Sequence, residues 1–268
     1  MSEQVIAHLL RRGRLLPIAF RLAFLASVVR CYPDNRRFER EHPGVPLPPL
    51  RHLHETSGTV SYRSYYTGGL RTATNVYHRM SRHLPDGPIR ICDWGCGPAR
   101  VVRHLPTIDG QRTVEAYGSD FNPDMVSWCR THIENVDFRL NGLEPPLDFE
   151  DAAFDCLYSF SVYTHIPAHL QQAWLHENLR VVRPGGLVQL TFLGDSFKHR
   201  LLAEEREVYE TQGMVSRGEV EPGSAWFTTY HNPRFVEETF LEGLEIVERK
   251  LHPEGAPPWQ DIWLVRKP

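Results

Sequence analysis

The sequence lacks the charge excess that marks many nucleic-acid-binding or disordered proteins. Its 268 residues include 30 basic and 33 acidic side chains, so the formal net charge is only −3. No basic clusters with interleaved aromatic residues point to RNA or DNA, and no acidic tail points to a solvated disordered segment. Hydrophobic residues make up 41% of the chain, which is ordinary globular composition. We therefore expect a folded protein whose partners do not include nucleic acid.

Cysteines are too few and too scattered to form a disulfide framework. An odd number of them, partly inside predicted strands, indicates reduced thiols. No second pair of Cys or His lies at zinc spacing from Cys92 and Cys96. We expect a cytoplasmic protein without a metal site. The five are Cys31, Cys92, Cys96, Cys129 and Cys156.

No segment is long and apolar enough to cross a bilayer. The richest stretch, Leu15 to Val29, follows three arginines and loosely resembles a signal peptide. Pro17 and Arg21 interrupt it, however, and no small-residue cleavage site follows. We predict a helix that packs on the domain, with export or attachment to a membrane surface as the alternatives. The oligomeric state is left open.

Residues 1–85 are predicted to form a helical extension and lid. The pattern predicts a helix over 1–30, an irregular linker over the proline-rich segment 31–50, and a helix over 71–84. The tyrosines of 64–69 are expected either to cover the cofactor as a lid or to pack a small subdomain core.

Residues 86–268 alternate between strand and helix signals, which predicts an α/β domain with a mostly parallel sheet and right-handed crossovers. We expect helices from the first glycine loop through Leu105, from Asn122 onward and over 168–182. The segment 195–243 is expected to be a substrate-side insertion with helices at 198–212 and 233–241. The final two strands are joined too closely for a crossover helix, so they should be antiparallel. The predicted strands are 89–93, 114–119, 136–140, 154–160, 187–192, 244–251 and 261–266.

A glycine-containing turn directly follows the first predicted strand. It reads Asp93-Trp94-Gly95-Cys96-Gly97-Pro98-Ala99. The two glycines permit a tight turn and close approach of a ligand, and a helix beginning there would offer free N–H groups. The alternative for this segment alone is a purely structural turn between strand and helix. It also departs from the dinucleotide fingerprint, because Ala99 and Arg100 leave no third glycine.

Asp120 ends the second predicted strand, in the position where an acid accepts hydrogen bonds from a ribose diol. The alternative is a loop carboxylate that caps the next helix. The glycine turn and Asp120 together favour a nucleoside-binding site.

At this point the sequence resembles the class I S-adenosylmethionine-dependent methyltransferases. Four segments carry the resemblance in order: residues 93–97, 118–123, 154–165 and 179–186. It covers residues 86–194 and, more weakly, the remainder of the chain. It implies a Rossmann-like seven-stranded mostly parallel sheet with an antiparallel last strand, helices on both faces and S-adenosylmethionine as cofactor.

The resemblance also implies roles for individual residues. Gly95, Cys96 and Gly97 would line the methionyl part of the cofactor, and Asp93 would reach its ammonium group. Asp120 would hold the ribose hydroxyls. The remaining contacts would be Phe121 and Met125 beside the adenine, Asn141, Gly142 and Leu143 at its edge, and Ser159 and Phe160 at the methionyl end. Asn141 stands where many members have Asp.

The methyl acceptor is expected to be a small molecule, with oxygen or nitrogen as the accepting atom. His165 follows the fourth strand, where ligands of open α/β sheets bind, and is either the general base or a structural residue. The substrate candidates are Tyr65, Tyr66, Tyr163, Trp226, Tyr230, His231 and Gln260, although the aromatic ones are equally suited to packing.

Two other functions fit parts of this pattern. The strand–glycine–acid arrangement also serves NAD-dependent oxidoreductases, which the missing third glycine argues against. A protein could also bind S-adenosylmethionine without transferring its methyl group, as a binding module or a cyclase-like enzyme.

Overall fold

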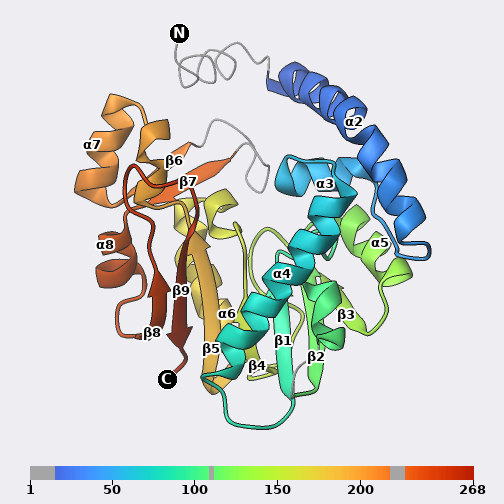
Figure 1. Cartoon of the computed structure of the whole chain (residues 1–268). Coiled ribbons are helices and arrows are strands. Elements are labelled where there is room, and N and C mark those ends of the chain that lie inside the picture. Colours follow the sequence, from blue (N-terminus) through green and yellow to red (C-terminus); the bar gives the residue numbers. More distant parts are fainter. Residues whose placement is uncertain (1–15, 109–111, 218–226) are drawn as a thin grey trace.

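The computed structural model describes residues 16–108, 112–217 and 227–268 (Figure 1). At its centre lies a seven-stranded sheet with the strand order β3-β2-β1-β4-β5-β9-β8. The strands are β1 (Ile89–Trp94), β2 (Val114–Asp120), β3 (Val136–Leu140), β4 (Phe154–Tyr158), β5 (Val182–Phe192), β8 (Glu245–Lys250) and β9 (Asp261–Arg266).

The strand directions confirm the predicted fold class. β1, β2, β3, β4 and β5 are mutually parallel. β9 runs antiparallel to both of its neighbours, β5 and β8. This is the mostly parallel sheet with one reversed strand that the closely spaced final strands predicted.

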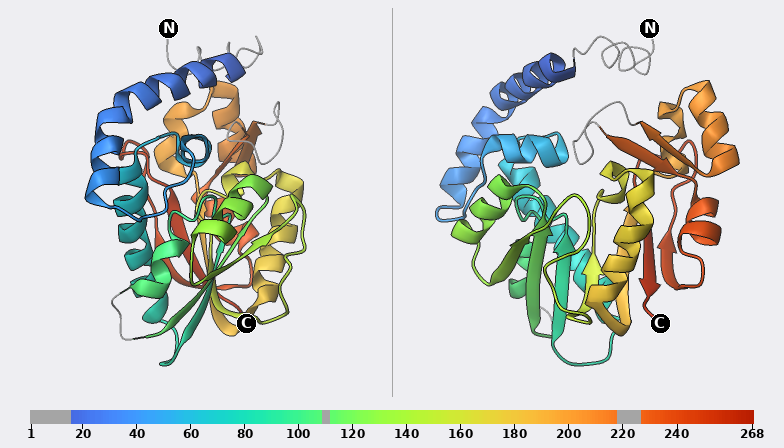
Figure 2. Two further views of the ribbon diagram at one scale, coloured as in Figure 1. Left: turned by 90° about the vertical axis from the view of Figure 1, so that its right-hand side faces the viewer. Right: turned by 180° about the vertical axis from the view of Figure 1, so that it is seen from behind.

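Helices cover both faces of the sheet, as the views in Figure 2 show. The sheet separates two hydrophobic cores, one on each face. The side chains of β1 show this, because Ile89 and Ile91 belong to one core and Cys92 and Trp94 to the other. The first core is closed by α4 (Tyr62–Ser81), η1 (Val102–Thr107) and α5 (Pro123–His132). The second is closed by α6 (Ala168–Val181), α8 (Pro233–Phe235) and η4 (Val236–Phe240).

The linker predicted over 31–50 is wrong in its first half, because α2 (Leu16–Glu41) continues through Pro33. Tertiary contacts outweigh the poor helix propensity of proline here. The Asn35 amide donates to the Val60 carbonyl at 2.8 Å, and its oxygen accepts from the Tyr62 N–H at 2.9 Å. Phe38 is fully buried in the same segment.

The helix predicted over 71–84 begins earlier, at Tyr62, after Ser61 caps the N–H of Ser64. Its adjacent glycines suggest a loop in the sequence, but Gly69 serves close packing. A Cβ at Gly69 would lie 1.9 Å from the Arg100 carbonyl oxygen. α4 therefore lies directly against the segment that follows β1, and residues 64–69 do not form a lid.

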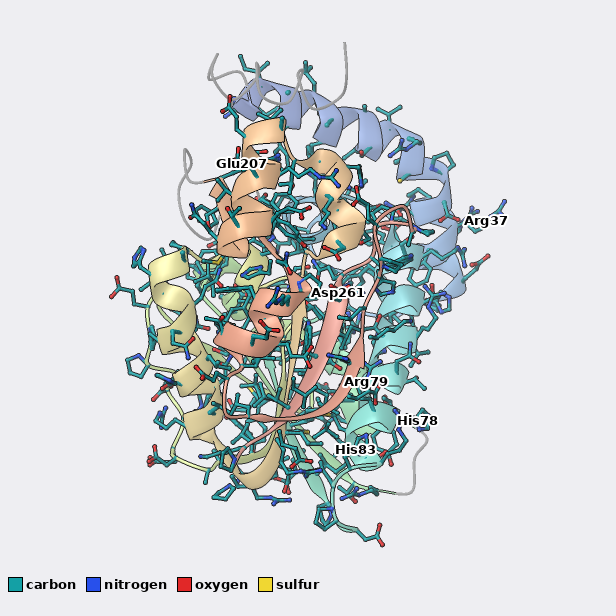
Figure 3. The ribbon with its side chains drawn as sticks, turned by 90° about the vertical axis from the view of Figure 1, so that its left-hand side faces the viewer. Arg37, His78, Arg79, His83, Glu207 and Asp261 are labelled. Atoms are coloured by element: carbon teal, nitrogen blue, oxygen red, sulfur yellow. The ribbon has the colours of Figure 1, made fainter. Side chains whose placement is uncertain are left out.

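α4 is also attached to the far edge of the sheet. The Arg79 guanidinium donates to Glu248 on β8 at 3.1 Å and to the buried Gln189 on β5 at 2.8 Å. Figure 3 shows Arg79 on the side of α4 that faces these strands. The N-terminal helices are thus joined to the sheet by polar as well as apolar contacts.

The segment after β1 differs from the predicted helix through Leu105. Residues 98–101 form turns, and only the short 3₁₀ helix η1 follows, with Pro106 inside it. Proline lacks the N–H that a continuing α-helix requires. No α-helix therefore begins at the glycine turn in the described segment 95–108.

The insertion contains elements that the sequence did not reveal. η3 (Asp195–Arg200) and α7 (Ala203–Gln212) replace the single predicted helix over 198–212. The segment between the two predicted helices includes β6 (Met214–Arg217) and β7 (Thr228–His231), which pair antiparallel in a second, two-stranded sheet. Four-residue strands give too short an alternation to be recognised.

Candidate functional site

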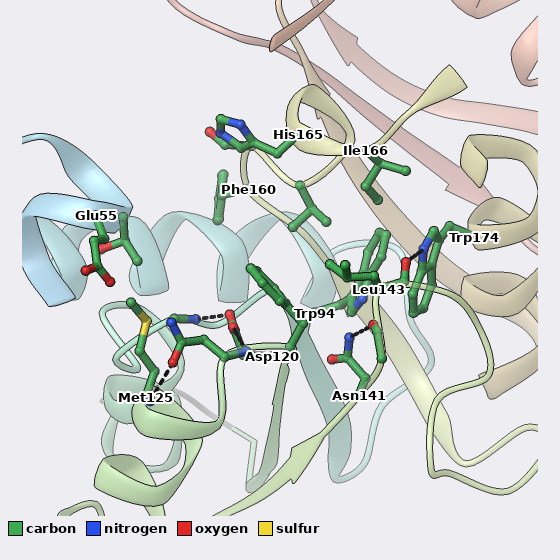
Figure 4. A pocket seen from close by; sticks show the side chains of 18 of the residues that line it. Glu55, Trp94, Asp120, Met125, Asn141, Leu143, Phe160, His165, Ile166 and Trp174 are labelled. Atoms are coloured by element: carbon green, nitrogen blue, oxygen red, sulfur yellow. Dashed lines mark hydrogen bonds between the residues drawn. The ribbon is translucent and has the colours of Figure 1, made fainter. Parts of the chain in front are cut away.

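A cavity of about 420 Å³ opens at the carboxyl ends of β1, β2 and β4 (Figure 4). This size lies within the range usual for small-molecule sites. Its lining comes from the sheet edge, from η2 (Tyr163–His165) and α6, and from the N-terminal helices α2 and α3 (Leu50–Ser57). The lining residues are Phe20, Glu55, Thr56, Trp94, Gly95, Gly97, Asp120, Phe121, Asn122, Met125, Asn141, Gly142, Leu143, Phe160, Ser161, Val162, His165, Ile166, Pro167, Leu170 and Trp174.

The glycine turn is held open by alternate left-handed residues. Gly95, Gly97 and Ala99 have φ values of 76°, 52° and 59°. The N–H groups of Gly95 and Cys96 both donate to the Ser119 carbonyl, at 2.7 and 3.0 Å. A Cβ at Gly95 would lie 2.3 Å from Val162 Cγ2, so glycine is required by space as well as by φ.

Asp120 joins the glycine turn to the end of β2. Its Oδ2 accepts the Gly97 N–H at 2.8 Å, and its Oδ1 accepts the Asn122 N–H at 2.9 Å. Burial raises the pKa of this carboxyl, while the backbone hydrogen bonds oppose the shift. A carboxylate has about four acceptor positions, so each oxygen can still receive a ligand hydroxyl.

Asp93 lies behind the cavity rather than on its lining. The side chain is 3% exposed, and β1 places it beside Tyr158 of β4. Burial raises the pKa of Asp93 to about 7, and the nearby Asp120 adds to this shift. Any contact between Asp93 and a ligand in the cavity therefore requires an intermediary such as water.

The loop after β3 is fixed by side-chain hydrogen bonds. The Ser119 hydroxyl lies 2.5 Å from Asn141 Oδ1, and Asn141 Nδ2 donates to the Gly142 carbonyl at 2.7 Å. The Trp174 indole N–H donates to the Leu143 carbonyl at 3.0 Å. Asn141 thus shapes this wall of the cavity while its amide is engaged within the protein.

Nine of the twelve predicted cofactor residues line the cavity. These are Gly95, Gly97, Asp120, Phe121, Met125, Asn141, Gly142, Leu143 and Phe160. The other three do not: besides Asp93, the Cys96 thiol packs into the core near Gly118, and Ser159 is fully buried.

His165 lines the cavity on the side opposite Asp120, as Figure 4 shows. Its Nδ1 lies 2.7 Å from the Phe227 carbonyl oxygen. A carbonyl only accepts hydrogen bonds, so Nδ1 carries the proton, and in the neutral ring Nε2 carries the lone pair. Gln171 supports this segment by donating to the Tyr163 and Ile166 carbonyls at 3.1 and 3.0 Å.

Tyr65 and Tyr66, predicted as substrate contacts, do not line the cavity. Tyr65 is buried in α4 and donates its hydroxyl to the Pro98 carbonyl at 2.6 Å. Tyr66 packs against His104, with ring centroids 4.8 Å apart. Both rings support the outer side of the segment after β1, because residues 62–81 form one helix instead of a lid.

Three further residues predicted as substrate contacts are buried and do not line the cavity. Tyr163 is fully buried and its hydroxyl accepts from Asn178 at 3.0 Å. His231 is fully buried against Gln171, with its pKa lowered to about 3 by burial. Tyr230 is buried on β7 within the small cluster of the insertion.

Gln260 does not line the cavity. Its amide donates at 2.6 Å to the hydroxyl of Ser161, which is a lining residue. Trp226 lies outside the described residues.

The sequence did not reveal the contribution of the N-terminal helices. Phe20 of α2 and Glu55 and Thr56 of α3 line the cavity opposite the sheet edge. Helix α3, which carries Glu55 and Thr56, could have been predicted from its ends. Pro49 precedes it, and Gly58 ends it in the left-handed conformation with φ of 66°. A helix bounded in this way just before α4 is placed to cover the sheet edge.

The charges around the cavity are of one sign. Glu55 and Asp120 line it, and none of the described lining residues is Lys or Arg. Burial also raises the pKa of Glu55. The cavity therefore suits a cationic ligand better than one with several phosphates.

Comparisons with known proteins agree with the motifs. Residues 91–186 match the family model described as a methyltransferase domain. A 24-methylenesterol C-methyltransferase 2 of Oryza sativa subsp. japonica is 32% identical over 163 residues, which cover 57% of this chain and 42% of that protein. The match thus spans less than half the length of this relative.

Solved structures share the fold. A SAM-dependent methyltransferase from Methanosarcina mazei matches with a TM-score of 0.52 and 16% identity, over 70% of this chain and 96% of that one. The magnesium protoporphyrin IX methyltransferase of Synechocystis PCC 6803, solved with bound SAH, matches with a TM-score of 0.51 and 16% identity, over 82% and 98%. At these identities the similarity concerns the fold. Among the described residues no helix has the length and apolar character needed to cross a membrane.

Proposed function

We propose that the chain is a class I S-adenosylmethionine-dependent methyltransferase and that it transfers a methyl group to a small, mainly apolar acceptor in the cavity beside His165. The single observation that carries the proposal is the pairing of Gly97 with Asp120 in a cavity lined by acids. Asp120 Oδ2 lies 2.8 Å from the Gly97 nitrogen, so a ribose held by this carboxylate lies next to the glycine turn.

The charge of the site favours this cofactor over NAD. S-adenosylmethionine carries a sulfonium and an ammonium, which Glu55 and Asp120 would stabilise. NAD carries a pyrophosphate, which usually rests on the N-terminus of an α-helix. In the described segment 95–108 the glycine turn leads into turns and a 3₁₀ helix, and no Lys or Arg from the described residues lines the cavity.

The residues of the chain would act mainly by alignment. The sulfonium makes the methyl carbon electrophilic, so an acceptor positioned behind the carbon–sulfur bond needs little further activation, and such positioning contributes about 7–11 kcal/mol. The apolar wall formed by Phe160, Ile166 and Leu170 would hold the acceptor and exclude water. His165, with its Nδ1 proton held by the Phe227 carbonyl, would accept a proton at Nε2 from an acceptor that must lose one.

The accepting atom is a separate part of the proposal. We favour oxygen or nitrogen, since His165 can take the proton that either loses. A carbon acceptor is the second candidate, because the rice relative is named for C-methylation.

Calorimetry and a transfer assay test the proposal. We expect S-adenosylhomocysteine to bind and NAD to show no binding at the same concentration. Incubation with methyl-labelled S-adenosylmethionine and a set of apolar alcohols, phenols and amines should then yield labelled product. Binding of NAD alone would assign the site to an oxidoreductase, and cofactor binding without transfer to any acceptor would favour a non-methylating role.

A further inference from the structure

The outer face of α2 carries a row of exposed apolar side chains. Of the eleven large hydrophobic side chains that are exposed in the described chain, five lie on this helix. They are Ile18, Leu22, Leu25, Val29 and Tyr32, which are 57%, 63%, 58%, 75% and 62% exposed. Their spacing of four and three residues puts them on one side of the helix. We name this row the α2 stripe.

The opposite side of α2 is the one that packs on the protein. Ser27, Asn35 and Phe38 are buried there, and Phe20 packs against His54 of α3 with ring centroids 4.2 Å apart. The stripe is therefore not part of the fold's core. α2 runs along the outside of the molecule, with α3 and α4 between it and the sheet (Figures 1 and 2).

The charges along the N-terminal part of the stripe are positive. From Gln4 to Pro33 the sequence contains five arginines and no Asp or Glu, although the whole chain has a formal charge of −3. Two of them, Arg21 and Arg30, are exposed on α2. The acids of α2 lie at its C-terminal end and are each paired with an arginine; they are Asp34, Glu39 and Glu41. An apolar face whose free charges are mainly cationic is complementary to an anionic lipid surface.

From this charge and this stripe we infer that α2 lies on an anionic membrane surface with the α2 stripe in the lipid and its arginines among the headgroups. A second copy of the chain fits the observations less well. A stable interface requires about 20–30 residues from each partner, and the stripe offers five side chains.

The cavity lies beside α2, the helix that carries the stripe. Phe20, on the inner side of α2, lines the cavity, so a membrane beneath α2 lies beside the site. The acceptor would then be a lipophilic molecule that enters from the bilayer. This second statement rests on the proposed function, whereas the attachment of α2 does not.

Co-sedimentation with vesicles tests the attachment. We expect the protein to bind vesicles made of equal parts phosphatidylcholine and phosphatidylglycerol and to bind pure phosphatidylcholine more weakly. Leu22→Gln and Leu25→Gln should each reduce binding about tenfold, since a buried leucine contributes about one factor of ten or more. Arg21→Gln should reduce binding to the anionic vesicles about fivefold.

Leu251→Gln is the matched control, because Leu251 is 39% exposed and lies outside α2. It should bind like the wild type, and every variant should keep the far-UV circular dichroism spectrum and the melting temperature of the wild type, which shows that the fold is intact. Equal binding of wild type and Leu25→Gln would overturn the inference. So would a wild-type dimer, seen by light scattering, that Leu25→Gln dissociates, because a second copy would then cover the stripe. Vesicle binding is measured without cofactor, so a failed methyl-transfer assay leaves its result unaffected.

Discussion

Asp120 is the residue on which the cofactor proposal depends most directly. Asp120→Asn keeps the size of the side chain but replaces one acceptor oxygen with an NH₂ group facing a backbone N–H. We expect the affinity for S-adenosylhomocysteine to fall about 10- to 100-fold, since hydrogen bonds to a charged group contribute about 1.5–3 kcal/mol. Calorimetry measures the change. Asp124→Asn is the control, because its side chain is 71% exposed, and equal losses in both variants would remove Asp120 from the site.

A variant at His165 tests whether this residue contributes to turnover or to cofactor binding. We expect His165→Gln to lower kcat by about 10²–10⁴-fold if the acceptor loses a proton, with cofactor affinity close to that of the wild type. The exposed His169 on α6 provides a matched control as His169→Gln. Wild-type turnover of His165→Gln at saturating acceptor would assign His165 a structural role, through its contact with the Phe227 carbonyl.

The buried carboxyl of Asp93 makes stability depend on pH. Its pKa is raised to about 7 in the folded protein, so between about pH 4 and pH 7 the unfolded chain releases a proton that the folded chain retains. The contribution of Asp93 to the free energy of unfolding therefore falls as pH rises through this window, and stays low above it. We expect Asp93→Asn to gain stability relative to the wild type over the same window, by up to about 4 kcal/mol. Urea unfolding at several pH values tests this, and a difference between the two proteins that is constant with pH contradicts it.

At the scale of elements, the glycine turn and η2 must fit together. Gly95→Ala introduces a methyl group 2.3 Å from Val162 Cγ2 at a φ of 76°. We expect a loss of about 2–4 kcal/mol from backbone strain and overpacking together. Gly255→Ala has a similar φ of 85° but nothing within 4 Å, so it should lose only the strain contribution.

Val162→Ala should rescue part of the Gly95→Ala loss, because it removes the clashing methyl group. Thermal denaturation of the single and double variants measures the coupling. Equal losses of stability in Gly95→Ala and Gly255→Ala would show that the segment around Val162 moves away from the added methyl group.

The sequence predicted the central elements well because their signals are local. β1, β2 and β3 were placed almost to the residue, and the reversed direction of β9 followed from the short connection before it. The errors lie where distant contacts decide the structure. Pro33 stays helical because Asn35 and Phe38 are anchored elsewhere, and the glycines of α4 permit close packing instead of a loop.

The same distinction applies to the site. Residues on the strand ends, such as Gly95 and Asp120, could be predicted because a motif carries them. The wall formed by Phe20, Glu55 and Thr56 could not, since these residues have no motif and reach the cavity only through the packing of α2 and α3. Tyr163 and His231 were misjudged because the sequence does not distinguish a buried aromatic or histidine near a site from an exposed one.

At the scale of the whole molecule, the N-terminal helices share a core with the sheet. Met80 of α4 is fully buried beside Ile89 and Ile91. We expect Met80→Ala to lower the free energy of unfolding by about 2–5 kcal/mol. The buried Trp94, Trp174 and Trp263 lie in the other core, whereas Trp128 packs against the core of Met80. In a Trp128→Phe background, tryptophan fluorescence therefore reports mainly on the distant layer. A single transition shifted by Met80→Ala indicates one cooperative unit, and an unchanged fluorescence transition would show that α4 and its core unfold separately.

The position of β9 in the sheet constrains the order in which the sheet can form during synthesis. β8 precedes it in the chain, yet β9 is the strand that separates β8 from β5. Until residues 261–266 are free to fold, β8 has no neighbour with which to pair, and the edge of β5 is open. Trp263, Leu264 and Val265, all fully buried, close that gap only when they emerge from the exit tunnel. A nascent chain halted a few residues short of them would therefore expose an open strand edge, the surface that chaperones bind and that aggregation begins from.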